Sequence, residues 1–150
     1  METLSLPQVS VVIPAYTARK YIAETLESAL NQNLHSFEIS VVDDGSGDGT
    51  HTVVDKYRDR GVALLRQPNS GIRAARNRAL SVARGQFVVL LDSDDLWKLD
   101  YLQTMVGFLE LAKTALRRAC EWRPKWRDLA AQISFAVAPG TTRLALRGRS

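Results

Sequence analysis

Four short apolar runs limit the folds that this chain can adopt. They are rich in Val, Ile and Leu and occupy residues 9–13, 37–42, 62–65 and 86–91. Largely apolar runs of this length are typical of strands buried on both faces of a parallel sheet. Each run is followed by Pro, Gly or Asp residues, which favour loops and turns. The sequence therefore predicts four strands, each ending in a loop.

Helical patterns lie between and after these runs. Apolar residues recur at the spacing of a helix in four segments, residues 18–32, 53–57, 74–83 and 102–118. Gly61 and Gly85 are predicted to end the second and third of these helices. Strands that alternate with helices favour an α/β fold, with a mostly parallel sheet and helices on both faces. Right-handed crossovers then bring the carboxyl ends of the strands to one edge of the sheet.

Three carboxylates, Asp92, Asp94 and Asp95, follow the last apolar run. Charges at the end of a buried strand have no packing role that would offset their desolvation, so they indicate a site. They repel one another unless a cation lies between them, and oxygen ligands suit Mg2+ or Mn2+. An extended backbone would turn Asp92 and Asp94 to the same side. The alternative is a solvated acidic turn or a helix N-cap that starts at Ser93.

A second acidic pair, Asp43 and Asp44, follows the second apolar run and is itself followed by Gly45, Gly47 and Gly49. Ligands of open α/β sheets bind at the carboxyl ends of the strands, so the two acidic clusters are predicted to converge on one crevice. The glycines permit positive φ and a close approach of the backbone to a ligand. The alternative is that this glycine-rich stretch is only a flexible connection.

The usual phosphate-binding sequences are absent. The chain has neither G-x-G-x-x-G after its first strand nor G-x-x-x-x-G-K-[ST]. A diphosphate bound here would therefore need a metal ion and arginines to balance its charge, which is compatible with the aspartates.

Composition narrows the class of protein further. The chain is 45% hydrophobic and 24% charged, within the range of ordinary globular domains. It has one cysteine, Cys120, and so no internal disulfide, which favours a reducing compartment. No apolar run is long enough to span a bilayer, and the first residues lack a signal-peptide pattern. We expect a cytoplasmic location, with peripheral association at the inner membrane surface as an open alternative.

Four blocks occur in order along the chain: Val9–Tyr16, Val41–Thr50, Asn69–Ala79 and Leu90–Asp95. Together they resemble the nucleotide-binding half of family 2 glycosyltransferases, and the resemblance extends from residue 8 to about residue 110. It implies a Rossmann-like GT-A domain over residues 1–110. It also implies transfer of a sugar from a nucleotide-diphosphate sugar to an unknown saccharide or lipid-linked acceptor, with inversion and with Mn2+ or Mg2+ as the cofactor.

The resemblance also implies roles for the last acidic cluster. Asp92 would contact the ribose and the metal ion, Asp94 would be a metal ligand, and Asp95 would share the metal. The general base of this family lies in an acceptor-binding half, which residues 111–150 do not resemble. The catalytic base therefore stays unassigned, and the chain is expected to be a fragment with weak or no transferase activity.

Further roles implied by the resemblance concern the nucleotide. Asp44 would accept a hydrogen bond from the base, and Pro14, Ala15 and Tyr16 would lie along its ring. Arg73, in preference to Arg76, would approach the nucleotide; the alternative is that both arginines belong to a solvated helix face.

Two departures from the family pattern leave these groups in place. Thr17 stands where members usually carry Asn, and Lys98 and Leu99 stand where a Pro is common. Neither change removes a proposed ligand group.

The positive charge of the chain is concentrated at its end. Residues 1–110 contain 11 Lys and Arg against 14 Asp and Glu, whereas residues 111–150 contain 9 against 2. We expect residues 111–150 to form an atypical basic tail, partly helical or disordered.

Two interpretations of this tail stay open. In one, it makes the chain a non-catalytic nucleotide-binding module or a module that contacts nucleic acid or an anionic surface. The basic residues concerned are Arg117, Arg118, Arg123, Lys125, Arg127, Arg143, Arg147 and Arg149, interleaved with Trp122 and Trp126. In the other, the tail is unselected sequence that a truncation or a frame change has appended. We favour the second, and so do not expect nucleic acid as a partner.

Overall fold

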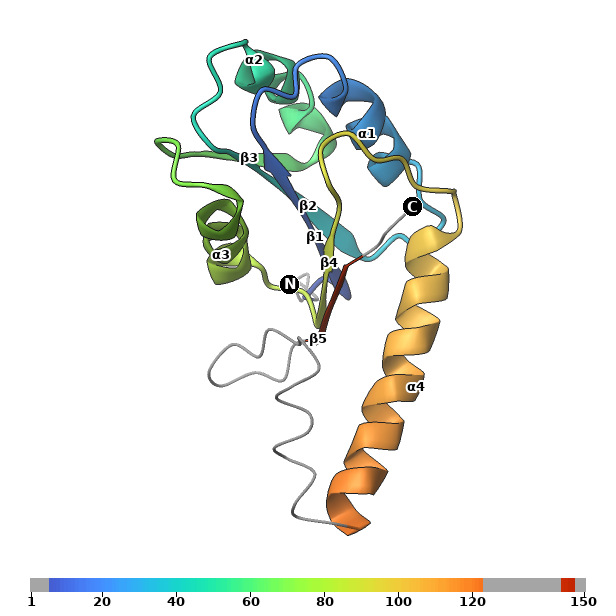
Figure 1. Ribbon diagram of the computed structural model, residues 1–150. Helices are drawn as coiled ribbons and strands as arrows, with labels where there is room; N and C mark the ends of the chain where they lie inside the picture. The colour runs from blue at the N-terminus through green and yellow to red at the C-terminus, as the bar shows by residue number, and fades with distance from the viewer. Residues whose placement is uncertain (1–5, 123–143, 148–150) are drawn as a thin grey trace, which may run out of the picture.

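A five-stranded parallel sheet forms the centre of the computed structural model, which describes residues 6–122 and 144–147 (Figure 1). Its strands lie in the order β3-β2-β1-β4-β5 and pair in parallel throughout. Their bounds are β1 (Val9–Ala15), β2 (Phe37–Asp43), β3 (Val62–Arg66), β4 (Phe87–Leu90) and β5 (Leu144–Arg147). The predicted α/β class and parallel sheet are confirmed.

Helices cover both faces of the sheet, as predicted. They are α1 (Ile22–Leu30), α2 (Thr50–Asp55), the short 3-10 helix η1 (Arg58–Arg60), α3 (Ile72–Val82) and α4 (Tyr101–Trp122). Apolar residues of α1, α2 and α4 pack in one core with one face of the sheet. On the other face, Ala75 and Ala79 of α3 pack against Val12, Val42 and Val88. The described part of the chain contains no helix with the length and apolarity that crossing a bilayer requires.

Of the two glycines predicted to end helices, one does so in the structure and the other does not. Gly61 has a φ of +86° and follows η1, as expected of a C-cap glycine. The same prediction is wrong for Gly85, because α3 ends at Val82 and Ala83 already has an extended backbone. Gly85 instead lies so close to β1 that a Cβ atom on it would be 2.4 Å from the backbone N of Ser10.

Beyond residue 110 the predicted helical segment extends four residues further than the expected end at 118, and a strand is present that we did not predict. Helix α4 continues without a break from Tyr101 to Trp122, across the expected boundary. Leu144–Arg147 forms β5, which pairs with β4 at the edge of the sheet. Most of the basic residues of the tail alternative lie outside the described residues, namely Arg123, Lys125, Arg127, Arg143 and Arg149, as does Trp126.

Parallel pairing explains why loops from different parts of the chain meet. Ala15, the last residue of β1, pairs with Asp43, and Val12 pairs with Leu90. The segments that follow β1, β2 and β4 therefore leave the sheet at the same edge. This edge carries the residues that the sequence predicted to form a site.

Thr17 has an unfavourable backbone conformation. Its φ of +51° is the one positive φ at a non-glycine position among the described residues, and β-branched residues rarely adopt it. Asn tolerates this region better, so Thr17→Asn is expected to raise the free energy of unfolding by about 0.5 to 1 kcal/mol. Urea denaturation measures this change. The matched control is Thr52→Asn, at an exposed position in α2; equal changes in both variants would contradict the prediction.

Candidate functional site

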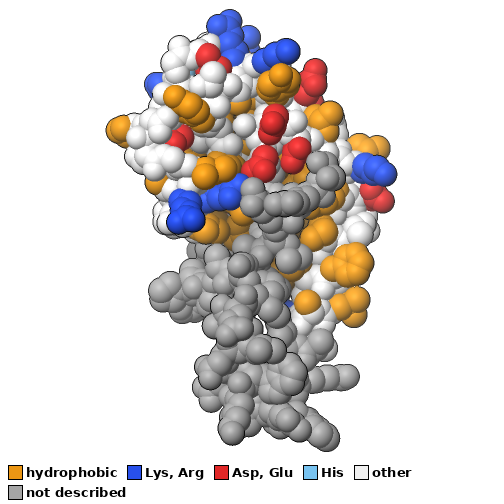
Figure 2. Space-filling view, in the orientation of Figure 1, with side chains coloured by type: hydrophobic (Ala, Val, Ile, Leu, Met, Phe, Trp, Pro, Cys, Tyr) orange, Lys and Arg blue, Asp and Glu red, His pale blue; other side chains and the backbone are white. Residues whose placement is uncertain are grey.

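A pocket of about 460 Å³ opens at the carboxyl edge of the sheet. Six residues predicted from the sequence line it, namely Pro14, Ala15, Tyr16, Asp44, Asp92 and Asp94. Five further residues complete the lining, namely Asn69, Gly71, Ile72, Ala75 and Ser93. Figure 2 shows acidic side chains gathered on one face of the molecule, beside basic and apolar ones.

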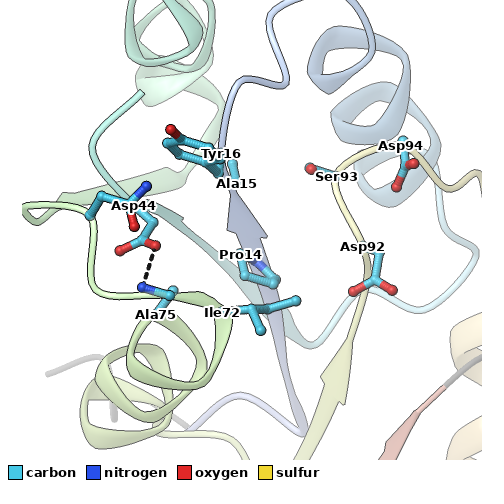
Figure 3. A pocket seen from close by; sticks show the side chains of 11 residues that line it. Pro14, Ala15, Tyr16, Asp44, Ile72, Ala75, Asp92, Ser93 and Asp94 are labelled. Atoms are coloured by element: carbon cyan, nitrogen blue, oxygen red, sulfur yellow. Dashed lines mark hydrogen bonds between the residues drawn. The ribbon is translucent and has the colours of Figure 1, made fainter. Parts of the chain in front are cut away.

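The acidic side chains lie on two sides of this pocket. Asp44 and Tyr16 lie on one side, and Asp92 and Asp94 lie on the other (Figure 3). Pro14 and Ile72 lie between them. Carboxylates from two loops that are distant in sequence thus border one hollow, as the sequence predicted.

Asp44 is almost completely buried and accepts three hydrogen bonds. The donors are Gln67 Nε2 at 2.7 Å and the backbone N–H groups of Ser70 at 2.9 Å and Gly71 at 2.8 Å. Burial raises the pKa of the Asp44 carboxyl, but these hydrogen bonds outweigh it, so the pKa lies below its ordinary value. A carboxylate has about four acceptor positions, so about one remains for a ligand. Asp44 therefore holds the loop before α3 and stays ionised at neutral pH.

Asp92 pairs with Arg76, which projects from α3. Arg76 Nη2 donates to Asp92 Oδ1 at 3.0 Å. The Nε atom of the same arginine is buried and has no hydrogen-bond partner. The guanidinium group thus lies beside the pocket with a buried donor still unpaired.

Two predicted site residues do not line the pocket. Arg73 is exposed on α3, and no ion pair among the described residues includes it. The backbone N–H of Asp95 donates to the Asp92 carbonyl at 3.1 Å, closing a turn. Burial and, to a smaller extent, the charge of Asp95 raise the pKa of Tyr101, the first residue of α4.

Asp43, the first acid of the earlier pair, is not part of the pocket lining. It is completely buried, and its Oδ1 accepts a hydrogen bond from the backbone N–H of Ser46 at 3.1 Å. Its Oδ2 lies 3.4 Å from Arg66 Nε and 3.9 Å from His51 Nδ1. Adjacent residues of a strand point to opposite sides, which explains why Asp44 and not Asp43 faces the pocket.

The carboxylates do not form a preformed metal cage. Among the described residues, no three His, Cys, Asp or Glu side chains are grouped closely enough to hold an ion. Asp92 and Asp94 nevertheless present oxygen donors at the pocket. Mg2+ is commonly held by one or two carboxylates together with substrate phosphates. The donor set therefore fits a hard cation that is shared with a diphosphate.

Four lining residues were not predicted to belong to the site, namely Asn69, Gly71, Ile72 and Ala75, although they lie within the block Asn69–Ala79. Gly71 has a φ of +86° and precedes α3. The Asn-Ser-Gly turn before an alanine-rich helix is the signal that could have identified them, because small residues leave room for a ligand beside the helix.

The sequence is similar to those of known glycosyltransferases. A family model described as glycosyl transferase family 2 matches residues 10–130. The putative teichuronic acid biosynthesis glycosyltransferase TuaG of Bacillus subtilis is 39% identical over 129 residues, which are 84% of this chain and 49% of that protein. The chain thus spans about half the length of this relative.

The fold of the chain is also similar to those of solved structures. The crystal structure of Staphylococcus aureus TarS 1-349 in complex with UDP-GlcNAc matches with a TM-score of 0.65 and 38% identity, over 69% of this chain and 31% of that one. The mannosyltransferase PcManGT from Pyrobaculum calidifontis, in complex with GDP-Man and Mn2+, matches with a TM-score of 0.58 and 32% identity, over 63% of this chain and 29% of that one.

Proposed function

The chain belongs to glycosyl transferase family 2, and we propose that it is the donor-binding half of an enzyme that transfers a sugar from a nucleoside-diphosphate sugar. The observation that carries this proposal is the position of Asp44 opposite Asp92 and Asp94 across one pocket. The acceptor is proposed to be a saccharide or a lipid-linked saccharide. Cytoplasmic location and peripheral membrane association remain predictions.

The two sides of the pocket suit the two ends of a nucleotide. Asp44 has one acceptor position left for a base N–H, and Tyr16, which is largely exposed, offers a ring face beside Pro14 and Ala15. Asp92 and Asp94 would face the ribose and a metal ion shared with the diphosphate. Asp95, which does not line the pocket, would join them only if its side chain turned toward it.

The arginine that approaches the diphosphate is proposed to be Arg76. It already lies beside Asp92 and has a buried N–H donor without a partner. Guanidinium groups bind phosphate oxygens well because their donors are arranged in a planar fork. Arg73 would have to change its side-chain direction to reach the pocket.

The proposed reaction is an inverting glycosyl transfer. An acceptor hydroxyl attacks the anomeric carbon, and the nucleoside diphosphate leaves. A divalent cation bound with the diphosphate would act as a Lewis acid on the leaving group. The residues of this chain would bind and orient the donor, whereas the carboxylate base is expected in an acceptor-binding half. We therefore propose that this chain binds donors but transfers sugar weakly or not at all.

Thermal unfolding in the presence of UDP or GDP with Mn2+ tests the binding proposal. Ligand at about 100 times its Kd stabilises the folded state by about 2.7 kcal/mol, which predicts a rise in Tm of roughly 5 to 15 °C. Chelation of the metal ion and the variant Asp94→Asn are both expected to remove most of this rise. Absence of a shift with either nucleotide would refute the proposed function.

A further inference from the structure

Helix α1 presents buried polar side chains to the loop that carries the acidic cluster. This loop, residues 91–100, connects β4 to α4 and is called the acidic loop below. Thr25 of α1 is completely buried, and its hydroxyl donates to the carbonyl of Ser93 at 3.0 Å. Gln32, just after the same helix, is also buried. A polar residue on the buried face of a helix calls for an explanation, because burial of a hydroxyl is unfavourable without a partner.

Hydrogen bonds from Ser28 of α1 and from Gln32, just after the helix, hold the far end of the acidic loop. Ser28 Oγ accepts a hydrogen bond from the backbone N–H of Trp97 at 3.2 Å. Gln32 Nε2 donates to the carbonyl of Lys98 at 2.8 Å, and its Oε1 accepts from the N–H of Leu102 at 2.9 Å. The loop is therefore fixed at its start by Thr25 and at its end by Ser28 and Gln32.

The contact made by Thr25 is the one closest to the pocket. Ser93 lies between Asp92 and Asp94 in the sequence, and Figure 3 shows all three residues on one short stretch of loop. Fixing the carbonyl of Ser93 limits the rotation of the peptide groups on either side of it. Arg76 holds the Asp92 side chain from α3, whereas Thr25 holds the backbone from α1. The carboxylates are thus restrained from two helices on opposite faces of the sheet.

We propose that Thr25 is a positioning residue for donor binding: its hydroxyl fixes Ser93 so that Asp92 and Asp94 face the pocket. The inference rests on the proposed function, because it concerns the same carboxylates. It adds a residue that does not line the pocket and that acts only through the acidic loop.

The test compares three variants of the full chain. Thr25→Val keeps the shape and removes the O–H donor, Thr25→Ser keeps the donor, and Ser81→Ala removes an exposed hydroxyl that bonds only within α3. Amide hydrogen exchange is measured without ligand. We expect Thr25→Val to speed exchange in residues 92–97 by about fivefold or more, with no change in β1 and β2. Thr25→Ser and Ser81→Ala are expected to behave like the wild type.

Calorimetric titrations then separate the two halves of the pocket. Thr25→Val is expected to weaken Mn2+-dependent UDP binding by about tenfold, as is typical for loss of a group that orients metal ligands. The Kd of uracil, which lacks the ribose and is measured with the metal chelated, is expected to stay within about twofold of the wild-type value, because the Asp44 side of the pocket has other supports.

Three results would overturn this inference. They are unchanged exchange in residues 92–97, faster exchange throughout the chain, and equal weakening of UDP and uracil binding. Failure of the wild type to bind both UDP and GDP with Mn2+ would refute the proposed function instead. In that case the exchange data still decide whether Thr25 fixes the acidic loop.

Discussion

Replacement of Asp44 by Asn is expected to lower the free energy of unfolding by about 2 to 4 kcal/mol, because one or two of its three donors lose their partner and each unpaired buried group costs about 1 to 3 kcal/mol. Asn has one acceptor oxygen, and its amide group would face other N–H donors. The loop that carries Ser70 and Gly71 would then be free to move. UDP binding is expected to weaken more than tenfold, since this loop borders the pocket and the acceptor for the base changes.

Urea denaturation and calorimetric titration with UDP measure the two effects. Asp55→Asn is the matched control, because Asp55 is exposed in α2 and its one ion pair within the described part of the chain is with Arg58, three residues further along. An exposed pair of this kind contributes about 0 to 1 kcal/mol. If Asp44→Asn were no more destabilising than Asp55→Asn, the hydrogen bonds to Asp44 would not hold the loop.

The contribution of Asp44 should also depend on pH. Its pKa in the folded state lies below its ordinary value, so the folded state favours the ionised form. The stabilisation is complete above the pKa of the unfolded chain, about 4, and is lost as the pH falls through the lower folded value. The stability difference between the wild type and Asp44→Asn should therefore be constant near neutral pH and shrink in acid below about pH 4.

The strands and the edge that carries the site could be predicted from the sequence because these features depend on local patterns. The four predicted apolar runs agree with β1 to β4 within about two residues at each end. Parallel pairing then determines which loops meet, so Asp44, Asp92 and Asp94 could be assigned to one crevice before any coordinates.

The position of each residue around helix α3 distinguishes Arg73 from Arg76. Ala75 and Ala79 face the sheet. Arg76 lies close to this face, being one residue after Ala75 and three before Ala79, whereas Arg73 projects from the far side. The same reasoning, applied to the sequence, would have favoured Arg76 as the residue near Asp92.

Contacts between distant segments could not be predicted. The bond from Thr25 to Ser93 and those from Gln32 to Lys98 and Leu102 join residues more than 60 positions apart. Thr25 lies among apolar residues of an amphipathic helix, where its sequence pattern gives no indication of a partner. The pairing of β5 with β4 is similar, because it joins Leu144–Arg147 to a strand far earlier in the chain.

Gly85→Ala is expected to lower the free energy of unfolding by about 3 kcal/mol or to prevent folding, because overpacking at a site that cannot relax costs about 1 to 3 kcal/mol or more. The new Cβ atom would lie 2.4 Å from the Ser10 backbone N and 2.7 Å from the Val9 carbonyl carbon, both in the central strand β1. It would also disturb the 2.8 Å hydrogen bond from Gly85 N to Ser10 Oγ. A backbone atom in the middle of a sheet cannot move aside as a flexible side chain can.

Gly47→Ala is the matched control for this substitution. Gly47 does not have a positive φ, and an added Cβ there would meet nothing within 4 Å, so a change of less than about 0.5 kcal/mol is expected. Urea denaturation compares the two variants, and the yield of soluble chain replaces it if Gly85→Ala does not fold. Equal stability would contradict the close approach of Gly85 to β1.

The close approach of Gly85 to β1 also fixes where β4 begins, since Gln86 N and Phe87 N donate to the carbonyls of Pro7 and Gln8. A displaced β4 would carry Asp92 with it, so any folded Gly85→Ala chain should also bind UDP with Mn2+ more weakly than Gly47→Ala.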